Sequence, residues 1–195
     1  MIRTFVTVEL DAPLRQALAQ AQAALRGRLE KSVGPDARIQ WIKPASIHLT
    51  LKFLGDIPEE RVPDIQAALA RVAGGHRRFT VDVEGLGVFP DVRAPRVIWV
   101  GLTAHVDALT RLAADVEVAL GVIGFVPEPK PFHPHLTLAR IKNRARDVGR
   151  ALSAGGVLTQ DAKLGFLSVA AVSLMKSDLQ PSGSVYARLQ EIPLG

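Results

Sequence analysis

Two copies of one four-residue segment, His-Leu-Thr-Leu, stand in this chain, one beginning at His48 and the other at His135. In each copy a polar residue alternates with an apolar one, which is the period-two pattern of a half-buried strand. On such a strand His48 and Thr50 share one face, and so do His135 and Thr137, while the leucines point to the opposite face. Each segment therefore predicts an imidazole and a hydroxyl held together on a rigid element.

Two histidines that face one another suit general acid–base catalysis, because an imidazole with a pKa of about 6.5 exists in both protonation states near neutral pH. Hydrolysis of a strained cyclic phosphodiester needs that division of labour, since a base activates water while an acid protonates the departing ribose oxygen. Thr50 and Thr137 are expected to donate to phosphate oxygens. Lys52 and Arg140, at the ends of the two segments, are expected to neutralise charge on the phosphate. This scheme requires no metal ion and no cofactor.

A metal site is the second functional interpretation of the same residues. His48, His135 and His133 could bind zinc, but no nearby carboxylate completes a ligand set. His133 lies two residues before His135 and would share its face. Because Pro134 disturbs regular strand pairing at that point, His133 is expected at the rim of the site or in a structural role.

Aromatic side chains are candidates to stack on a nucleobase. Phe132, in the proline-rich stretch 127–134, and Phe53, directly after the first segment, are assigned this role. Aromatic residues make up only 5% of the chain, so most of them are expected to lie in the core. The other candidates for stacking are Trp41, Phe89, Trp99 and Tyr186.

The composition narrows the class of protein. The chain has 195 residues, of which 48% are hydrophobic, enough to bury a sizeable core in one domain of two similar lobes. Lys and Arg number 24 against 19 Asp and Glu, and the net charge of +5 favours an anionic partner. Basic residues that follow the second segment would extend such a site along an RNA backbone: they are Arg140, Lys142, Arg144 and Arg146.

The chain has no cysteine, which excludes disulfides, thiolate catalysis and cysteine-ligated metal centres. The first residues include Glu9 and Asp11 where a signal peptide would need an apolar run. The longest apolar stretch, 164–175, is too short for a membrane helix of about 20 residues. A cytoplasmic protein that contacts no membrane is therefore expected.

Periodicity and turn residues predict the elements around the two segments. Strands are expected at 2–10, 39–42, 46–53, 79–88, 96–100, around the second segment, and at 157–169, 171–175 and 184–192. Helices are expected at 14–29, 59–72, 106–120 and 143–154. No glycine-rich phosphate loop appears. The order predicts an α+β fold of largely antiparallel sheets, with helices outside and a pseudo-two-fold relation that brings both His-x-Thr segments to a central cleft.

At these residues the sequence resembles the two-histidine phosphoesterase superfamily, and specifically the RNA 2′,3′-cyclic phosphodiesterases, also called 2′-5′ RNA ligases. The paired signature stands here as 48–51 and 135–138. The resemblance extends over nearly the whole chain, through 3–6, Trp41, 52–56, Pro134, 174–177, Gly183 and Tyr186. Lys176 replaces an arginine that relatives often carry before the serine.

The resemblance implies metal-independent opening of a terminal 2′,3′-cyclic phosphate to a 2′-phosphate. In that scheme His48 would protonate the leaving 3′ oxygen and His135 would activate water, while Thr50 and Thr137 bind phosphate oxygens. Arg140 matches the arginine of the family at the end of the second motif. A 5′-hydroxyl in place of water would give a 2′-5′ linkage, reversibly. The implied partners are RNA ends with a 2′,3′-cyclic phosphate, tRNA fragments among them, or nucleotides, and a monomer is expected. A phosphodiesterase for a small cyclic nucleotide, or a module that binds RNA or nucleotides without turnover, are the alternatives.

Overall fold

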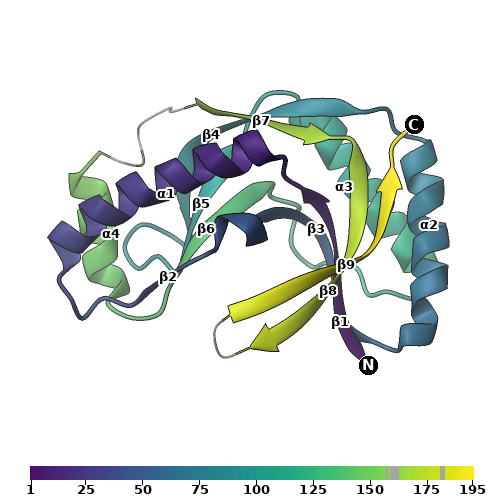
Figure 1. Cartoon of the computed structure of the whole chain (residues 1–195), viewed down its shortest axis with the longest axis horizontal. Coiled ribbons are helices and arrows are strands. Elements are labelled where there is room, and N and C mark those ends of the chain that lie inside the picture. The colour runs from purple at the N-terminus through teal and green to yellow at the C-terminus, as the bar shows by residue number, and fades with distance from the viewer. Residues whose placement is uncertain (157, 159–162, 181–182) are drawn as a thin grey trace.

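The computed structural model describes residues 1–156, 158, 163–180 and 183–195, which form an α+β fold with two antiparallel sheets (Figure 1). The strands are β1 (Ile2–Glu9), β2 (Ile39–Trp41), β3 (His48–Ile57), β4 (Phe79–Phe89), β5 (Val97–Leu102), β6 (His135–Ile141), β7 (Lys163–Val169), β8 (Ala171–Gln180) and β9 (Gly183–Pro193). The α-helices are α1 (Ala12–Val33), α2 (Val62–Gly74), α3 (Val106–Val122) and α4 (Ala145–Ala154).

The order of strands gives the two sheets a common plan. One sheet has the order β3-β1-β8-β9 and the other β2-β6-β5-β4-β7. In both sheets, the strand that carries a His-x-Thr motif (β3 or β6) pairs with a strand that precedes it in the chain (β1 or β5). Two further strands follow, β8 and β9 in one sheet and β4 and β7 in the other. This is the predicted pseudo-two-fold relation, with β2 as an extra edge strand. The halves are interleaved, since β4 from the first half joins the second sheet and β8 and β9 close the first.

Helices cover the outer faces of the sheets, with α1 and α4 at one end of the molecule and α2 and α3 at the other (Figure 1). The larger hydrophobic core joins both sheets to α2, α3 and the first half of α1, through side chains such as Leu18, Leu49 and Leu136. A smaller core lies under the second half of α1 and α4, and includes Leu29 and Leu152. One long helix therefore spans both cores.

Local signals explain where α1 begins and ends. The Asp11 carboxylate accepts a hydrogen bond of 2.9 Å from the Leu14 backbone N–H, which is an N-cap. Pro13 occupies the first turn, where its missing N–H costs nothing. Gly34 follows the last turn with φ of 76°, a conformation that favours glycine. The predicted helix is confirmed and is longer than its apolar pattern, because the caps set its ends.

Several boundaries differ from the prediction, among them the end of β8, which reaches Gln180 instead of residue 175. The first motif strand extends to Ile57, beyond the expected end at residue 53. A short 3₁₀ turn, Glu59–Arg61, precedes α2, because Pro63 fits the first turn of the helix better than its interior. The strand expected from residue 157 begins at Lys163 in the described chain, and Leu158 is not in a strand, while 157 and 159–162 lie outside the described residues.

Across the described ranges, no helix is long and apolar enough to span a membrane.

Candidate active site

The first motif lies on β3 with its polar side chains on the face opposite the core. His48 pairs with Glu9 of β1 and Thr50 pairs with Thr7, so these side chains share one face of the sheet. Leu49 and Leu51 are buried in the core on the other side. The predicted shared face of His48 and Thr50 is therefore confirmed, and the neighbouring strand adds a carboxylate to it.

The second motif lies on β6 in the corresponding orientation. His135 is opposite Gly101 and Thr137 is opposite Trp99 of β5, while Leu136 and Leu138 are fully buried. The predicted shared face of His135 and Thr137 is also confirmed. β3 and β6 belong to different sheets but approach one another, so the two motifs meet between the sheets.

Each motif strand carries a β-bulge directly after its threonine. On β3 the register moves from Thr50 to Lys52, which leaves Leu51 as the extra residue. On β6 it moves from Thr137 to Ala139, which leaves Leu138 as the extra residue. A bulge reverses the alternation of side chains beyond it. The residue five positions after each histidine, rather than four, therefore returns to the face of the histidine.

Because of this bulge, Lys52 does not lie on the site face, where it was predicted to neutralise charge on the phosphate. Its side chain is only 2% exposed and points away from the site, where Nζ donates to Glu117 Oε1 of α3 at 2.5 Å and to the Val126 carbonyl at 2.9 Å. Strict alternation would have placed Lys52 beside His48. Because Leu51 is an extra residue, Lys52 instead enters the core face, and it is not available to a phosphate between the sheets.

Arg140, unlike Lys52, lies on the site face of its strand. It lies five residues after His135, is exposed, and shares the face of Val97 and Trp99 on the partner strand. Its charge lowers the pKa of both His48 and His135, so its guanidinium lies near both imidazoles. The structure thus brings together Arg140, the two histidines and the two threonines, as the sequence predicted.

The bulge on β6 is held from the other side of the sheet by Gln22, a buried residue of α1. Its Nε2 donates to the carbonyl of Leu138 at 2.9 Å and to that of Ile42 at 2.8 Å. The Leu138 carbonyl also accepts from the Ile42 backbone N–H at 2.9 Å. The carbonyl of the extra residue therefore accepts two hydrogen bonds, as a buried backbone group requires.

Both histidines are oriented by the same backbone contact. His48 Nδ1 donates to the carbonyl of Ser46 at 2.9 Å, and His135 Nδ1 donates to the carbonyl of His133 at 2.7 Å. A carbonyl can only accept, so Nδ1 carries the proton in each ring. Nε2, at the opposite edge, is left in each case to take up or release a proton.

Aromatic rings surround each imidazole. Phe89, Trp99 and Tyr186 were among the candidates for base stacking in the sequence, whereas Phe5 was not. Phe5 and Tyr186 lie 4.8 and 5.0 Å from the His48 ring, measured between centroids. Phe89 lies 5.0 Å from the His135 ring and Trp99 lies 6.2 Å from it. These residues come from β1, β9, β4 and β5, and only the pairing of strands far apart in the sequence brings them to the motifs.

The two predicted stacking residues differ in their surroundings. Phe53 occupies the position on β3 that corresponds to Arg140 on β6 and is 58% exposed, with its ring 6.0 Å from that of Phe5. Phe132 is partly buried against the larger core. Of the two, Phe53 offers the freer ring on the face of the histidines. His133 packs edge-on against His135, with 6.2 Å between ring centroids, and is exposed at the rim as expected.

Burial dominates the electrostatics of the pair. Loss of hydration lowers the pKa of His48 below its usual value, against the Ser46 carbonyl and Glu9, which raise it. Burial likewise lowers the pKa of His135, with further lowering from the charges of His133 and Arg140. Glu9 is itself bound by Ser173 Oγ, which donates to its carboxylate at 2.7 Å.

The zinc interpretation finds no support in the arrangement of ligands. Within the parts of the chain that the structure describes, no three His, Asp or Glu side chains are grouped so that they could hold a metal ion. A pair of histidines beside an arginine is instead suited to an anion, because the cation would repel a second positive charge.

Comparison with known proteins agrees with this geometry. The family model described as LigT-like phosphoesterase matches the chain over residues 8–99 and again over 100–186, so each match contains one motif. An RNA 2′,3′-cyclic phosphodiesterase of Methanothermobacter thermautotrophicus is 32% identical over 190 residues, which is 97% of each chain. A protein of the same name from Aquifex aeolicus is 33% identical over 86% of this chain and 88% of its own.

A solved structure shows the same fold. The crystal structure of a protein from Thermus thermophilus superposes with a TM-score of 0.77 at 31% identity, and the match covers 99% of this chain and 98% of that one. The duplicated motif, the interleaved sheets and the full-length matches agree with one another. The chain belongs to the family of LigT-like phosphoesterases.

Proposed function

We propose that this protein is an RNA 2′,3′-cyclic phosphodiesterase that opens a terminal 2′,3′-cyclic phosphate to a 2′-phosphate. The observation that carries the proposal is the pair of imidazoles, His48 and His135, each held by a backbone carbonyl through Nδ1 and both near Arg140. Full-length relatives that bear the name of this activity support it.

In the proposed reaction, His135 Nε2 takes a proton from a water molecule, whose oxygen attacks phosphorus. The bond between phosphorus and the 3′ oxygen breaks, and His48, protonated at Nε2, gives its proton to that oxygen. The product is a 2′-phosphate beside a free 3′-hydroxyl. Arg140 and the hydroxyls of Thr50 and Thr137 stabilise the charge on the phosphate oxygens as the reaction proceeds. The order of the two histidines rests on resemblance to the family.

The surroundings of the histidines favour this division of roles. His48 lies opposite Glu9, whose carboxylate favours the protonated form needed in the acid. His135 lies beside His133 and Arg140, whose charges favour the neutral form needed in the base. Unequal environments of this kind separate an acid from a base built from the same side chain.

The proposal extends to the partners and to the organisation of the chain. RNA ends with a 2′,3′-cyclic phosphate, tRNA fragments among them, or nucleotides are the proposed substrates, and Phe53 is the proposed platform for the terminal base. A 5′-hydroxyl that replaces water would give the 2′-5′ linkage. We expect one domain of two interleaved lobes acting as a monomer, and a cytoplasmic location stays a prediction from the sequence.

The test uses a short RNA ending in a 2′,3′-cyclic phosphate, incubated in EDTA with wild type, His48→Asn and His135→Asn. The position of the product phosphate is read by NMR or by chromatography against 2′- and 3′-phosphate standards. Wild type should give a 2′-phosphate, and each variant should lose roughly three or more powers of ten in rate. His105→Asn, at an exposed position outside both motifs, is the matched control and should retain full activity.

Other outcomes would contradict the proposal in distinct ways. Loss of wild-type turnover in EDTA would point to a metal-dependent reaction. Binding of the RNA without ring opening would point to a binding module. Rapid turnover of a small cyclic nucleotide together with slow turnover of RNA would move the substrate class to small molecules.

A further inference from the structure

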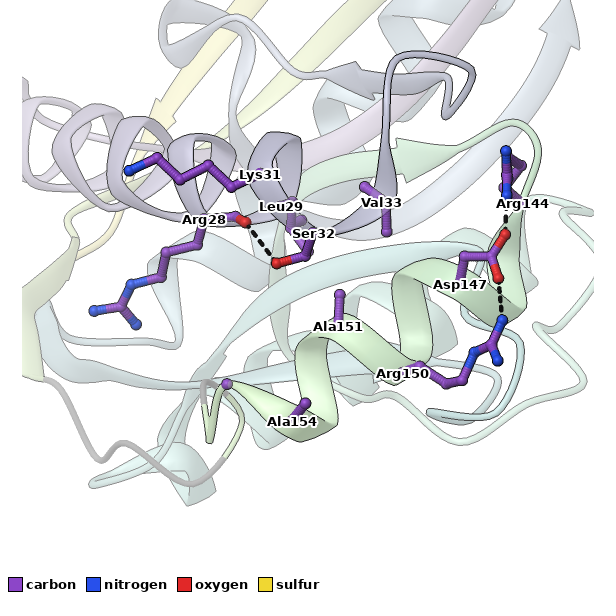
Figure 2. A pocket seen from close by; sticks show the side chains of 11 residues that line it. Arg28, Leu29, Lys31, Ser32, Val33, Arg144, Asp147, Arg150, Ala151 and Ala154 are labelled. Carbon is purple, nitrogen blue, oxygen red and sulfur yellow. Dashed lines mark hydrogen bonds and ion pairs between the residues drawn. The ribbon is translucent and has the colours of Figure 1, made fainter.

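A groove with a basic rim lies between the end of α1 and α4 (Figure 2). It has a volume of about 840 Å³. Its apolar lining includes Leu29, Val33 and Ala151. Around that lining stand four cationic side chains and one carboxylate: they are Arg28, Lys31, Arg144, Arg150 and Asp147. We call this feature the basic groove.

The single carboxylate of the basic groove is already matched. Asp147 accepts from Arg144 Nε at 2.7 Å and also pairs with Arg150, one arginine on each carboxylate oxygen (Figure 2). These contacts hold the pKa of Asp147 below its usual value. Arg28 and Lys31 on α1 have no ion pair with any described residue. Arg144 also contacts Asp36 at 3.5 Å, so the excess of positive charge that no described residue neutralises belongs to Arg28 and Lys31.

The basic groove is connected to the histidines by a short piece of chain. Arg140, near both imidazoles, ends the site face of β6, and Arg144 begins α4 only four residues later. Four residues span at most about 14 Å, so the Cα atoms of Arg140 and Arg144 lie within that distance. Because α1 and α4 pack on the face of β6 opposite Arg140, an RNA strand would pass around the end of β6 to reach the groove. Lys142 and Asn143 between them are exposed and add a further cation to the route.

We propose that the basic groove binds the phosphate backbone of the RNA substrate, at a segment on the 5′ side of the reacted end. This inference rests on the proposed function. Only the 3′ end of an RNA can carry the cyclic phosphate, so the remainder of the strand must leave the histidines in the 5′ direction. A cationic rim suits the phosphates, and the apolar lining suits ribose and base edges. The groove would thus recognise length in the substrate while the histidines recognise its end.

The test compares two substrates that share the same 3′-terminal nucleotides and cyclic phosphate. One is a dinucleotide, and the other has about 20 nucleotides, longer than typical single-strand sites of about 4–16 nucleotides. The variant is Arg28→Glu/Lys31→Glu, which alters two exposed side chains without an ion pair among the described residues. The matched control is Arg71→Glu/Arg77→Glu on and after α2, at the other end of the molecule, with the same change in net charge.

For the long RNA, the groove variant should raise KM by roughly tenfold or more over the control variant, with kcat unchanged. The slope of log affinity against log salt should fall in magnitude by about 1.4, as expected for two lost single-strand phosphate contacts. For the dinucleotide, KM and kcat should stay equal to those of the control. Equal effects of groove and control variants on the long RNA, or equal effects of the groove variant on both substrates, would overturn the inference.

A binding measurement separates this inference from the proposed function. Fluorescence anisotropy with the long RNA ending in a plain 3′-hydroxyl needs no turnover. If wild type opens no cyclic phosphate, the proposed function fails, and a weaker affinity of the groove variant than of the control in this assay would still support the groove as an RNA site. If turnover is normal and the two affinities are equal, the groove inference alone fails.

Discussion

Leu51 and Leu138 are structural equivalents, each the extra residue of a β-bulge that directly follows a motif threonine. The two bulges reverse the alternation of β3 and β6 at the same place. As a result, Phe53 and Arg140 emerge on the site face in corresponding positions of the two sheets. The pseudo-two-fold relation therefore places an aromatic ring and a guanidinium where a nucleotide could meet both.

The pH dependence of activity should reflect the lowered pKa of each histidine. Catalysis requires one proton on the pair, and burial lowers both values below about 6.5, so kcat/KM should be greatest on the acid side of that pH and fall as pH rises. The measurement is kcat/KM for a cyclic-phosphate dinucleotide across the pH range. A maximum above neutrality would contradict the assigned effect of burial.

Two substitutions should move this profile in opposite directions. Arg140→Gln removes a positive charge that lowers both pKa values, so both limbs should move to higher pH while the rate falls by about 10²–10³. Glu9→Gln removes a negative charge that raises the pKa of His48, so the limb that reports His48 should move to lower pH. A shift of either pH profile in the opposite direction would contradict the effect assigned to Arg140 or to Glu9 on the pKa of the histidines.

Lys52 should contribute to stability and not to phosphate binding. Lys52→Met leaves Glu117 without its cation, which should cost about 2–3 kcal/mol of unfolding free energy. This is below the cost for a fully buried pair, because the Glu117 side chain is 28% exposed. Urea unfolding measures the loss, and kcat/KM per folded molecule should fall by less than about tenfold. Arg140→Met is the matched comparison and should show a large loss of activity with little loss of stability. A large loss of activity without loss of stability in Lys52→Met would indicate that Lys52 binds the phosphate.

Phe53 should affect RNA binding more than stability. Loss of a stacked base costs about 1–3 kcal/mol, so Phe53→Ala should raise KM for the dinucleotide by about 5–150-fold with a small change in urea midpoint. Phe132→Ala should show the opposite balance, because this ring packs against the larger core. Equal KM values for Phe53→Ala and wild type would show that the terminal base of the substrate does not stack on Phe53.

Two helical glycines form a matched pair for packing. Outside its own helix backbone, no atom of the described residues lies within 4 Å of a Cβ added to Gly27 in α1, so Gly27→Ala should stabilise the protein by up to about 1 kcal/mol. A Cβ on Gly149 in α4 would lie 1.9 Å from the Val92 carbonyl oxygen, so Gly149→Ala should destabilise by about 2 kcal/mol or more. Thermal unfolding reports both changes, and a stable Gly149→Ala variant would mean that α4 can move from the 91–95 loop.

Alternation in the sequence was sufficient to place the two histidines and threonines, because the buried leucines fix which face turns to the core. It was insufficient for Lys52, since Leu51 has the same side chain as an ordinary strand residue and nothing local marks it as extra. Arg140 lies on the face of His135 because Leu138 is an extra residue, whereas strict alternation from His135 would have turned it toward the core.

Long-range pairing accounts for the rest of the site. Phe5 lies in a strand that was predicted, but its place beside His48 depends on the pairing of β1 with β3, and that of Tyr186 depends on β9. The α+β class and most element boundaries followed from period and capping residues. The position of α4 against α1, which forms the basic groove, depends on tertiary packing that no local pattern contains.

The carbonyls that bind the two imidazoles belong to the main chain, so neither hydrogen bond depends on the side chain of Ser46 or of His133. A proton relay built on an aspartate or glutamate can be lost by one point mutation, whereas here any residue that keeps the same backbone path supplies the same acceptor. The backbone conformation therefore determines which nitrogen of each imidazole carries the proton. Substitution of either side chain should therefore leave Nδ1 of the neighbouring imidazole protonated, provided that the backbone keeps its path.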